Sequence, residues 1–148
     1  MQEIEYQWVK GIQYKDRICQ FLNEIDSIMI PTLSERVYIA DYAGKLAHLA
    51  ETLFIVQKGC DIASCSVYCN SEFAFISSIA VKKDFLKQGI GTILMNEVKS
   101  HAISKGCESI QLEVYTQNSI ALMFYEKNDF MVIEEKSNLK KMEYLFSK

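Results

Sequence analysis

The sequence predicts one mixed α/β domain, and three observations support this. Of its 148 residues, 49% are hydrophobic, which is enough to bury a sizeable core in one domain. Stretches with strand-like alternation and stretches with helical periodicity follow one another in the order β, α, α, three β, α, β, α, β, β. No linker, repeat or low-complexity segment divides the chain, so we expect residues 1–148 to act as a single domain.

The N-terminal third predicts a short strand followed by two helices. Apolar residues alternate over 4–8, and they recur at helical spacing over 15–29, where Pro31 ends the helix. Thr32 and Glu35 have capping-box spacing, which predicts that the second helix begins there.

The rest of the chain predicts three strands, then two helices alternating with further strands. The three strands cover 52–57, 62–69 and 73–81, and the third is apolar on both faces, as a central strand would be. The later elements are a helix that follows the glycines and stops at Gly106, a strand over 109–115, a helix over 119–128 capped by Asn118, and a hairpin of 130–135 with 142–146.

Charge and hydropathy argue against nucleic-acid and membrane partners. Sixteen Lys and Arg residues against nineteen Asp and Glu residues give a net charge of −3, so no basic field attracts nucleic acid. The hydrophobic runs are strand-sized, and the acidic start lacks the apolar core of a secretory leader. We therefore expect a cytoplasmic protein.

Five cysteines without a CxxC pair indicate reduced thiols in a cytosolic protein. Cys60, Cys65 and Cys69 are close enough in sequence to raise the question of a zinc site. A fourth ligand is missing, and neither His48 nor His101 is nearby in sequence. The sequence therefore predicts ordinary packing of these thiols and no metal.

The turn L-K-Q-G-I-G-T places Gly89 and Gly91 between a buried strand and a helix. Glycines at such a position let backbone N–H groups approach an anion, and the helix N-terminus adds positive potential. Lys82, Lys83 and Lys87 lie beside the turn. The dinucleotide fingerprint is absent because Leu94 fills its third glycine position. A glycine-eased turn without a ligand is the alternative.

Two motifs together give a resemblance. The turn reads L-K-Q-G-I-G, and a later segment reads N-S-I-A-L-M-F-Y-E-K-N-D-F. With these motifs the chain, from about Phe54 to its C-terminus, resembles the GNAT superfamily of N-acetyltransferases, whose corresponding patterns are R/Q-x-x-G-x-G/A and N-x-x-A-x-x-x-Y-[E]-K-x-G-F. The resemblance implies a mixed, mostly antiparallel sheet flanked by helices, acetyl-CoA as cosubstrate, and a primary amine as acceptor.

The sequence departs from the family pattern at two positions. Leu86 stands where the family has Arg or Gln, which implies weaker cofactor affinity. Asp129 stands where the family has Gly, and Asp tolerates left-handed dihedrals better than most residues, so the helix can still end there.

The resemblance also implies a cofactor site. The strand around Val81 would pair with the pantetheine arm where neighbouring strands part, with the Val81 N–H polarising the thioester carbonyl. The loop from Leu86 to Thr92 would hold the pyrophosphate. The implied cofactor-binding residues are Ile79, Ala80, Val81, Leu86, Lys87, Gln88, Gly89, Ile90, Gly91, Thr92, Asn118 and Tyr125.

Tyr125 occupies the family's tyrosine position, which implies a general acid that protonates the departing thiolate. Glu113 lies twelve residues earlier, where a branch of the family that acetylates protein N-termini has a catalytic glutamate, and is the candidate base. Other members of the family have a glutamate base earlier in the chain, but the matching position here is Phe75. The alternative bases are therefore Glu72, Tyr68 or a water held by Ser77 and Ser78. A cysteine acyl-enzyme is disfavoured because no His is placed to activate a thiol.

The acceptor is the least determined feature. Glu35, Tyr38 and Tyr42, from the first two helices and their loop, are candidates to line its pocket. Small amines and peptide N-termini both stay open, and a homodimer is a further possibility that the resemblance raises. The rival from another class is a non-catalytic module that binds CoA or a partner. Leu86 and the missing earlier glutamate favour this rival, whereas the intact Tyr125 and Glu113 oppose it.

Overall fold

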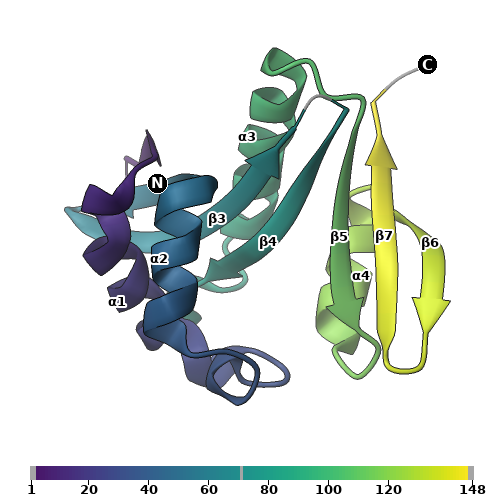
Figure 1. Ribbon diagram of the computed structural model, residues 1–148, viewed down its shortest axis with the longest axis horizontal. Coiled ribbons are helices and arrows are strands. Elements are labelled where there is room, and N and C mark those ends of the chain that lie inside the picture. The colour runs from purple at the N-terminus through teal and green to yellow at the C-terminus, as the bar shows by residue number, and fades with distance from the viewer. Residues whose placement is uncertain (1–2, 71, 147–148) are drawn as a thin grey trace.

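The computed structural model describes residues 3–70 and 72–146. Within these residues, seven strands form one sheet in the order β1-β2-β3-β4-β5-β7-β6 (Figure 1). Neighbouring strands are antiparallel except for β4 and β5, which run parallel. The predicted mixed, mostly antiparallel α/β fold is therefore confirmed.

The element order also matches the prediction. The strands are β1 (Glu5–Val9), β2 (Glu51–Gln57), β3 (Cys60–Cys69), β4 (Phe73–Val81), β5 (Ser109–Tyr115), β6 (Met131–Lys136) and β7 (Leu139–Leu145). The α-helices are α1 (Lys15–Ile25), α2 (Ile39–Leu49), α3 (Ile90–Ser104) and α4 (Ser119–Lys127). The strand predicted to be central, β4, has three strands on each side of it.

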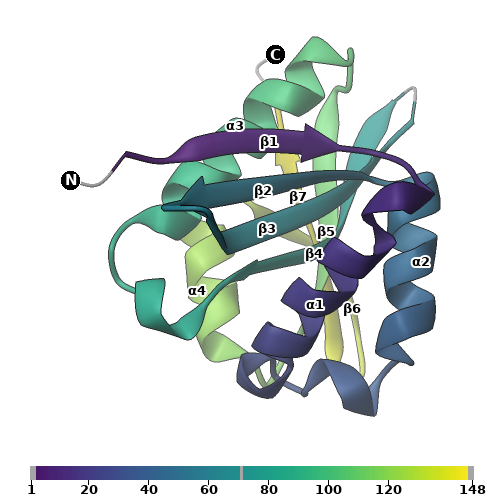
Figure 2. The same cartoon turned by 90° about the vertical axis from the view of Figure 1, so that its left-hand side faces the viewer.

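A helical layer covers each face of the sheet, because successive side chains of a strand point to opposite faces. In β2, Leu53 and Ile55 belong to one buried cluster with residues of α3 and α4. Phe54 and Val56 belong to a second cluster with residues of α1 and α2. Figure 2 shows α1 and α2 on one side of the sheet and α3 and α4 on the other.

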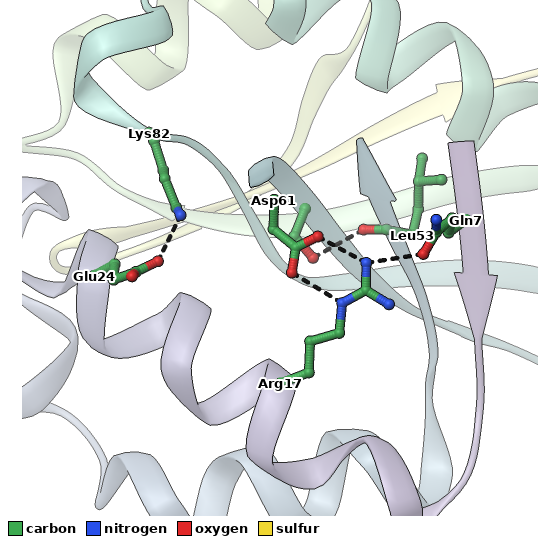
Figure 3. Close-up of polar contacts among 7 residues, drawn as sticks. Gln7, Arg17, Glu24, Leu53, Asp61 and Lys82 are labelled. Carbon is green, nitrogen blue, oxygen red and sulfur yellow. Dashed lines mark hydrogen bonds and ion pairs between the residues drawn. The ribbon is translucent and has the colours of Figure 1, made fainter. Parts of the chain in front are cut away.

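Ion pairs fix α1 over the sheet at two points (Figure 3). The Arg17 guanidinium donates to both carboxylate oxygens of Asp61 on β3, at 2.9 and 2.7 Å, and to the side-chain oxygen of Gln7 on β1 at 2.9 Å. Near the other end of the helix, Lys82 lies 2.5 Å from Glu24. These contacts hold the segment after α1 close to the end of β4.

The second helix begins later than predicted. Thr32 makes no side-chain cap hydrogen bond, and only a 3₁₀ turn, Leu33–Glu35, follows it before α2 starts at Ile39. The Asp26 carboxylate accepts the Ser34 N–H at 2.7 Å. Because this contact bridges the loop from the preceding helix, it favours a compact turn here. The predicted capping box is therefore wrong.

Other boundaries differ as well, and β3 begins at Cys60 rather than at residue 62. The first helix ends at Ile25 and continues as a 3₁₀ turn, Asp26–Ile28, so the prediction of a helix to residue 29 is too long. The last strand begins at Leu139 rather than at residue 142. Ser137 adopts a positive φ of 28°, and this compact turn lets the two strands pair almost at once.

The caps predicted for α3 and α4 are confirmed. The Asn118 side chain accepts the Ala121 N–H at 3.1 Å and caps α4. Gly106, with φ 84°, follows the end of α3. Asp129 follows α4 with φ 73°, so a non-glycine residue occupies the left-handed region there, as predicted.

We expect Asp129→Gly to stabilise the protein by about 0.5–1 kcal/mol, because glycine adopts positive φ without the steric cost that a Cβ brings. Chemical denaturation followed by circular dichroism measures this change. Lys127→Gly, in the last turn of α4, is the control and should destabilise by about 0.5–1 kcal/mol. A loss of stability in Asp129→Gly would contradict this expectation. It would show that the Asp129 side chain adds more to the free energy of unfolding than the strained backbone removes.

Candidate active site

Strands β4 and β5 pair at one end only. The paired residues run from Phe73 with Ser109 to Phe75 with Gln111, and the strands then diverge (Figure 1). The register between β3 and β4 shifts at the same level, so Ser77 has no partner on β3. An extra residue of this kind bends a strand and increases its twist. The expected parting of two neighbouring strands is therefore present.

Tyr42 of α2 holds this bulge. Its hydroxyl donates to the Ser77 carbonyl oxygen at 3.0 Å and lies 2.5 Å from the Ser77 Oγ. A carbonyl that has left the sheet ladder needs another donor when it is partly buried. Burial raises the pKa of the Tyr42 phenol, so the hydroxyl keeps its proton at neutral pH.

A cavity of about 450 Å³, here called the first cavity, lies beside the diverging end of β4. Its walls are Ile28, Met29, Ile30, Ile79, Ala80, Val81, Phe85, Leu86, Lys87, Gly89, Ile90, Gly91, Thr92, Leu94, Asn118, Ile120, Ala121, Phe124 and Tyr125. Of the predicted cofactor-binding residues, Gln88 alone is outside this set. Its side chain is exposed and donates to the Asp84 carbonyl at 3.4 Å.

The two glycines of the turn act for different reasons. Gly89 has φ 80°, which favours glycine, and it directly precedes α3. A Cβ on Gly91 would lie 3.1 Å from a ring carbon of Phe124, so the missing side chain lets α4 approach the start of α3. The turn is thus shaped by backbone conformation at one position and by close packing at the other.

Backbone direction leaves donors facing the gap between the strands. The Lys82 N–H donates to the Ile62 carbonyl on β3 at 2.9 Å. Because alternate residues of a strand direct their N–H groups to opposite sides, the N–H of Val81 faces away from β3. The Lys82 side chain pairs with Glu24, so acidic charge balances it, whereas Lys87 lies in the cavity wall.

A second cavity of about 330 Å³ lies between β4 and β5 on the side of α2. Tyr42 and Glu113 line it, together with Arg36, Phe75, Ser77, Ser78 and Tyr115 among others. Tyr38 is 84% exposed, and neither Tyr38 nor Glu35 lines the cavity. Of the three residues predicted to line an acceptor pocket, only Tyr42 therefore lines this cavity.

Tyr125 lies where the two cavities meet, because it lines both. Its side chain is buried, and burial, with a smaller contribution from nearby Cys65, raises the pKa of its phenol. The phenol is therefore protonated at neutral pH. Glu113 is exposed on β5 and lines the second cavity only.

The other predicted candidates lie less favourably. Glu72 and Tyr68 are outside both cavity walls, whereas Ser77 and Ser78 line the second cavity. Cys65 is fully buried, and burial raises the pKa of its thiol, which leaves little reactive thiolate.

Several residues of the cavity walls were not predicted as site residues from the sequence. Phe85 and Phe124 are aromatic residues of the first cavity, and Met29 and Ile30 line both cavities from the loop after α1. Phe124 directly precedes Tyr125 inside a quoted motif, but helical spacing alone does not distinguish a cavity residue from a core residue. The resemblance implied that the loop containing Met29 and Ile30 helps to select the acceptor, but no motif predicts which of its residues line a cavity.

The acetyltransferase (GNAT) family model matches residues 15–130. The chain therefore belongs to this family, and the predicted resemblance is confirmed.

Particular relatives extend the comparison. A stretch of 73 residues is 41% identical to N-alpha-acetyltransferase 60 of Xenopus tropicalis and covers 47% of this chain but only 30% of that protein. The fold is similar to PaiA N-acetyltransferase of Thermoplasma acidophilum in complex with coenzyme A, with a TM-score of 0.81, 18% identity, and coverage of 97% and 99% of the two chains. It is also similar to the ribosomal-protein-S18-alanine N-acetyltransferase of Escherichia coli, with a TM-score of 0.76, 17% identity, and coverage of 99% and 96%.

We expect Tyr42→Phe to destabilise the protein by about 1–2 kcal/mol, because the bulged Ser77 carbonyl then loses its donor. Thermal and urea unfolding measure this loss. Tyr38→Phe removes the same atom from an exposed tyrosine and should change stability by less than about 0.5 kcal/mol. Equal effects of the two substitutions would show that the hydroxyl of Tyr42 does not support the bulge.

Proposed function

We propose that residues 1–148 act as a single acetyl-CoA-dependent N-acetyltransferase domain that transfers the acetyl group directly to a primary amine. The observation that carries the proposal is the position of Tyr125. This buried, protonated phenol lies in the wall shared by two cavities, one along the glycine turn and one beside Glu113. A donor at such a junction suits a reaction between two bound molecules.

The first cavity suits a thioester cofactor with a pyrophosphate. The outward N–H of Val81 and its neighbours on β4 would pair with the pantetheine arm as an added strand and polarise the thioester carbonyl. The N–H groups at the start of α3 would bind the pyrophosphate, since the first turn of a helix has unpaired donors. Cofactors of this chemistry include CoA, which the Thermoplasma acidophilum protein binds in its crystal structure.

In this chemistry the ammonium acceptor must lose two protons, and the leaving thiolate must gain one. Glu113, directly or through a water, would take the proton that an ammonium acceptor must lose before it attacks. The amine nitrogen would then bond to the thioester carbon, and the carbon–sulfur bond would break. Tyr125 would donate its proton to the leaving thiolate, and the resulting phenolate would take the second proton that the bonded nitrogen gives up. The second cavity would hold the acceptor, and Tyr42 lies in its wall.

The acceptor is a small-molecule amine or a peptide N-terminus. The name of the Xenopus tropicalis relative supports the N-terminus, although the matched stretch spans under a third of that protein's length. A cytoplasmic location, a homodimer, and the lack of nucleic-acid and membrane partners stay predictions. In the part of the chain that the structure describes, no helix has the length and apolar character needed to span a membrane.

A non-catalytic CoA-binding or partner-binding module is the second candidate, and Leu86 favours it. This side chain is 48% exposed in the wall of the first cavity, where the family has a polar group.

We expect acetyl-CoA at about 100 times its dissociation constant to stabilise the native state by about 2.7 kcal/mol, which raises the melting temperature by a few degrees. Differential scanning fluorimetry checks this. Leu86→Arg should tighten binding by about threefold to tenfold, because its guanidinium can bond to a phosphate. Absence of any shift at millimolar acetyl-CoA would contradict the assigned cofactor site.

We expect Tyr125→Phe to lower kcat by about 100-fold or more with little change in acetyl-CoA affinity, since it removes only the acid. Thiol release with an amine panel measures the rate, and calorimetry measures the affinity. Glu113→Gln should slow the reaction mainly at low pH, where the acceptor amine is protonated and needs a base. The effect should shrink as the pH approaches the pKa of the amine, because more of the acceptor is then already deprotonated. Tyr38→Phe is the matched control. Turnover of Tyr125→Phe at the wild-type rate would rule out the acid role.

A further inference from the structure

A second cluster of reactive side chains lies far along α3 from the glycine turn. Glu51 is the first residue of β2, Cys69 is the last residue of β3, and His101 lies near the C-terminal end of α3. One ligand atom from each lies within 4.8 Å of the other two, and all three residues are half-buried. At about 1.5 Å per residue, His101 is about 16 Å along the helix from Ile90, so the cluster is separate from both cavities.

Neighbouring side chains hold two of the three groups in place. The Trp8 ring stacks on the His101 ring with centroids 3.7 Å apart and an interplanar angle of 14°. Glu51 directs Oε1 to the His101 Nε2, whereas Lys105 lies 3.4 Å from Oε2. Outer contacts of this kind orient carboxylate and imidazole ligands in metal sites.

We propose that Glu51, Cys69 and His101 form a binding site for a divalent cation of the zinc type. A thiolate, an imidazole and a carboxylate are the donors that Zn²⁺ prefers. Around tetrahedral Zn²⁺, with bonds of about 2.0–2.3 Å, ligand atoms lie about 3–4 Å apart. Separations below 4.8 Å therefore need only small adjustments. The negative charges of the thiolate and carboxylate would balance the cation.

The Cys69 thiol distinguishes this cluster from an ordinary ion pair between His101 and Glu51. His101 and Glu51 can satisfy each other by a hydrogen bond alone, yet Cys69 lies within reach of both. Cys107 also lies beside the Cys69 thiol, but it donates to the Asn70 carbonyl at 3.6 Å and is not one of the three converging ligands. Among the described residues the site therefore has three protein ligands, and water would fill the fourth position. A bound cation would link β2, β3 and α3 at this end of the sheet.

Cobalt substitution tests the site directly, since Co²⁺ bonded to a thiolate gains a charge-transfer absorption. The reduced full chain, stripped with a chelator, is titrated with Co²⁺ and then with Zn²⁺. We expect one equivalent of Co²⁺ to bind with this absorption, Zn²⁺ to displace it, and Zn²⁺ to raise the melting temperature. Failure of the absorption to appear at stoichiometric Co²⁺ would overturn the proposal.

Variants separate the site from adventitious thiols. Cys69→Ser should abolish the charge-transfer absorption and weaken Zn²⁺ binding by about 100-fold or more, because even loss of an outer contact costs about 10–100-fold. Glu51→Gln keeps the size of the side chain and can still bond to His101, and should weaken binding by at least about tenfold. Cys60→Ser, at the exposed start of the same strand, and Cys107→Ser should retain the absorption. Loss of the absorption in Cys60→Ser, or its survival in Cys69→Ser, would contradict the assignment.

Discussion

The structure depends on one bent strand. At Ser77 the ladder between β3 and β4 gains an extra residue, and β4 turns away from β5 after only a few paired residues. A bend of this kind exposes backbone groups that would be costly to bury without partners. Tyr42 satisfies the Ser77 carbonyl, and the Val81 N–H faces away from β3. Both cavities follow from this bend, because each lies beside the parted strands.

The helices complete the cavities, and polar contacts hold them where they are needed. Arg17 and Glu24 bind α1 to the sheet and to the residue after β4. The loop that follows α1 then lines both cavities through Met29 and Ile30. From the other face, α4 approaches the start of α3 because Gly91 has no side chain. The proposed cofactor site thus combines the two helical layers through the opening in the sheet.

The two ends of α3 face different chemical environments. Its N-terminus follows the glycine turn near the open end of β4, and the first turn of a helix has backbone N–H groups without intrahelical partners. Its C-terminal part meets the ends of β2 and β3, where Glu51, Cys69 and His101 converge. A cation there would stiffen the closed end of the sheet, leaving the opening at the other end to ligand binding. In these two proposals, the N-terminal end of α3 binds the cofactor and its C-terminal part binds the cation.

Much of the fold and of the candidate site could be predicted from patterns that are local in the sequence. The order of elements, the cap at Asn118 and the left-handed residue Asp129 follow from periodicity and backbone preference, and the glycine turn with its tyrosine follows from two motifs at family spacing. The start of α2 was missed because a contact across the loop outweighed a local capping pattern. The cluster at Cys69 was missed because its partners lie far away in the chain. The sequence by itself therefore determined the elements and the motif residues, whereas tertiary structure decided which distant side chains meet, since strand pairing and helix packing alone bring them together.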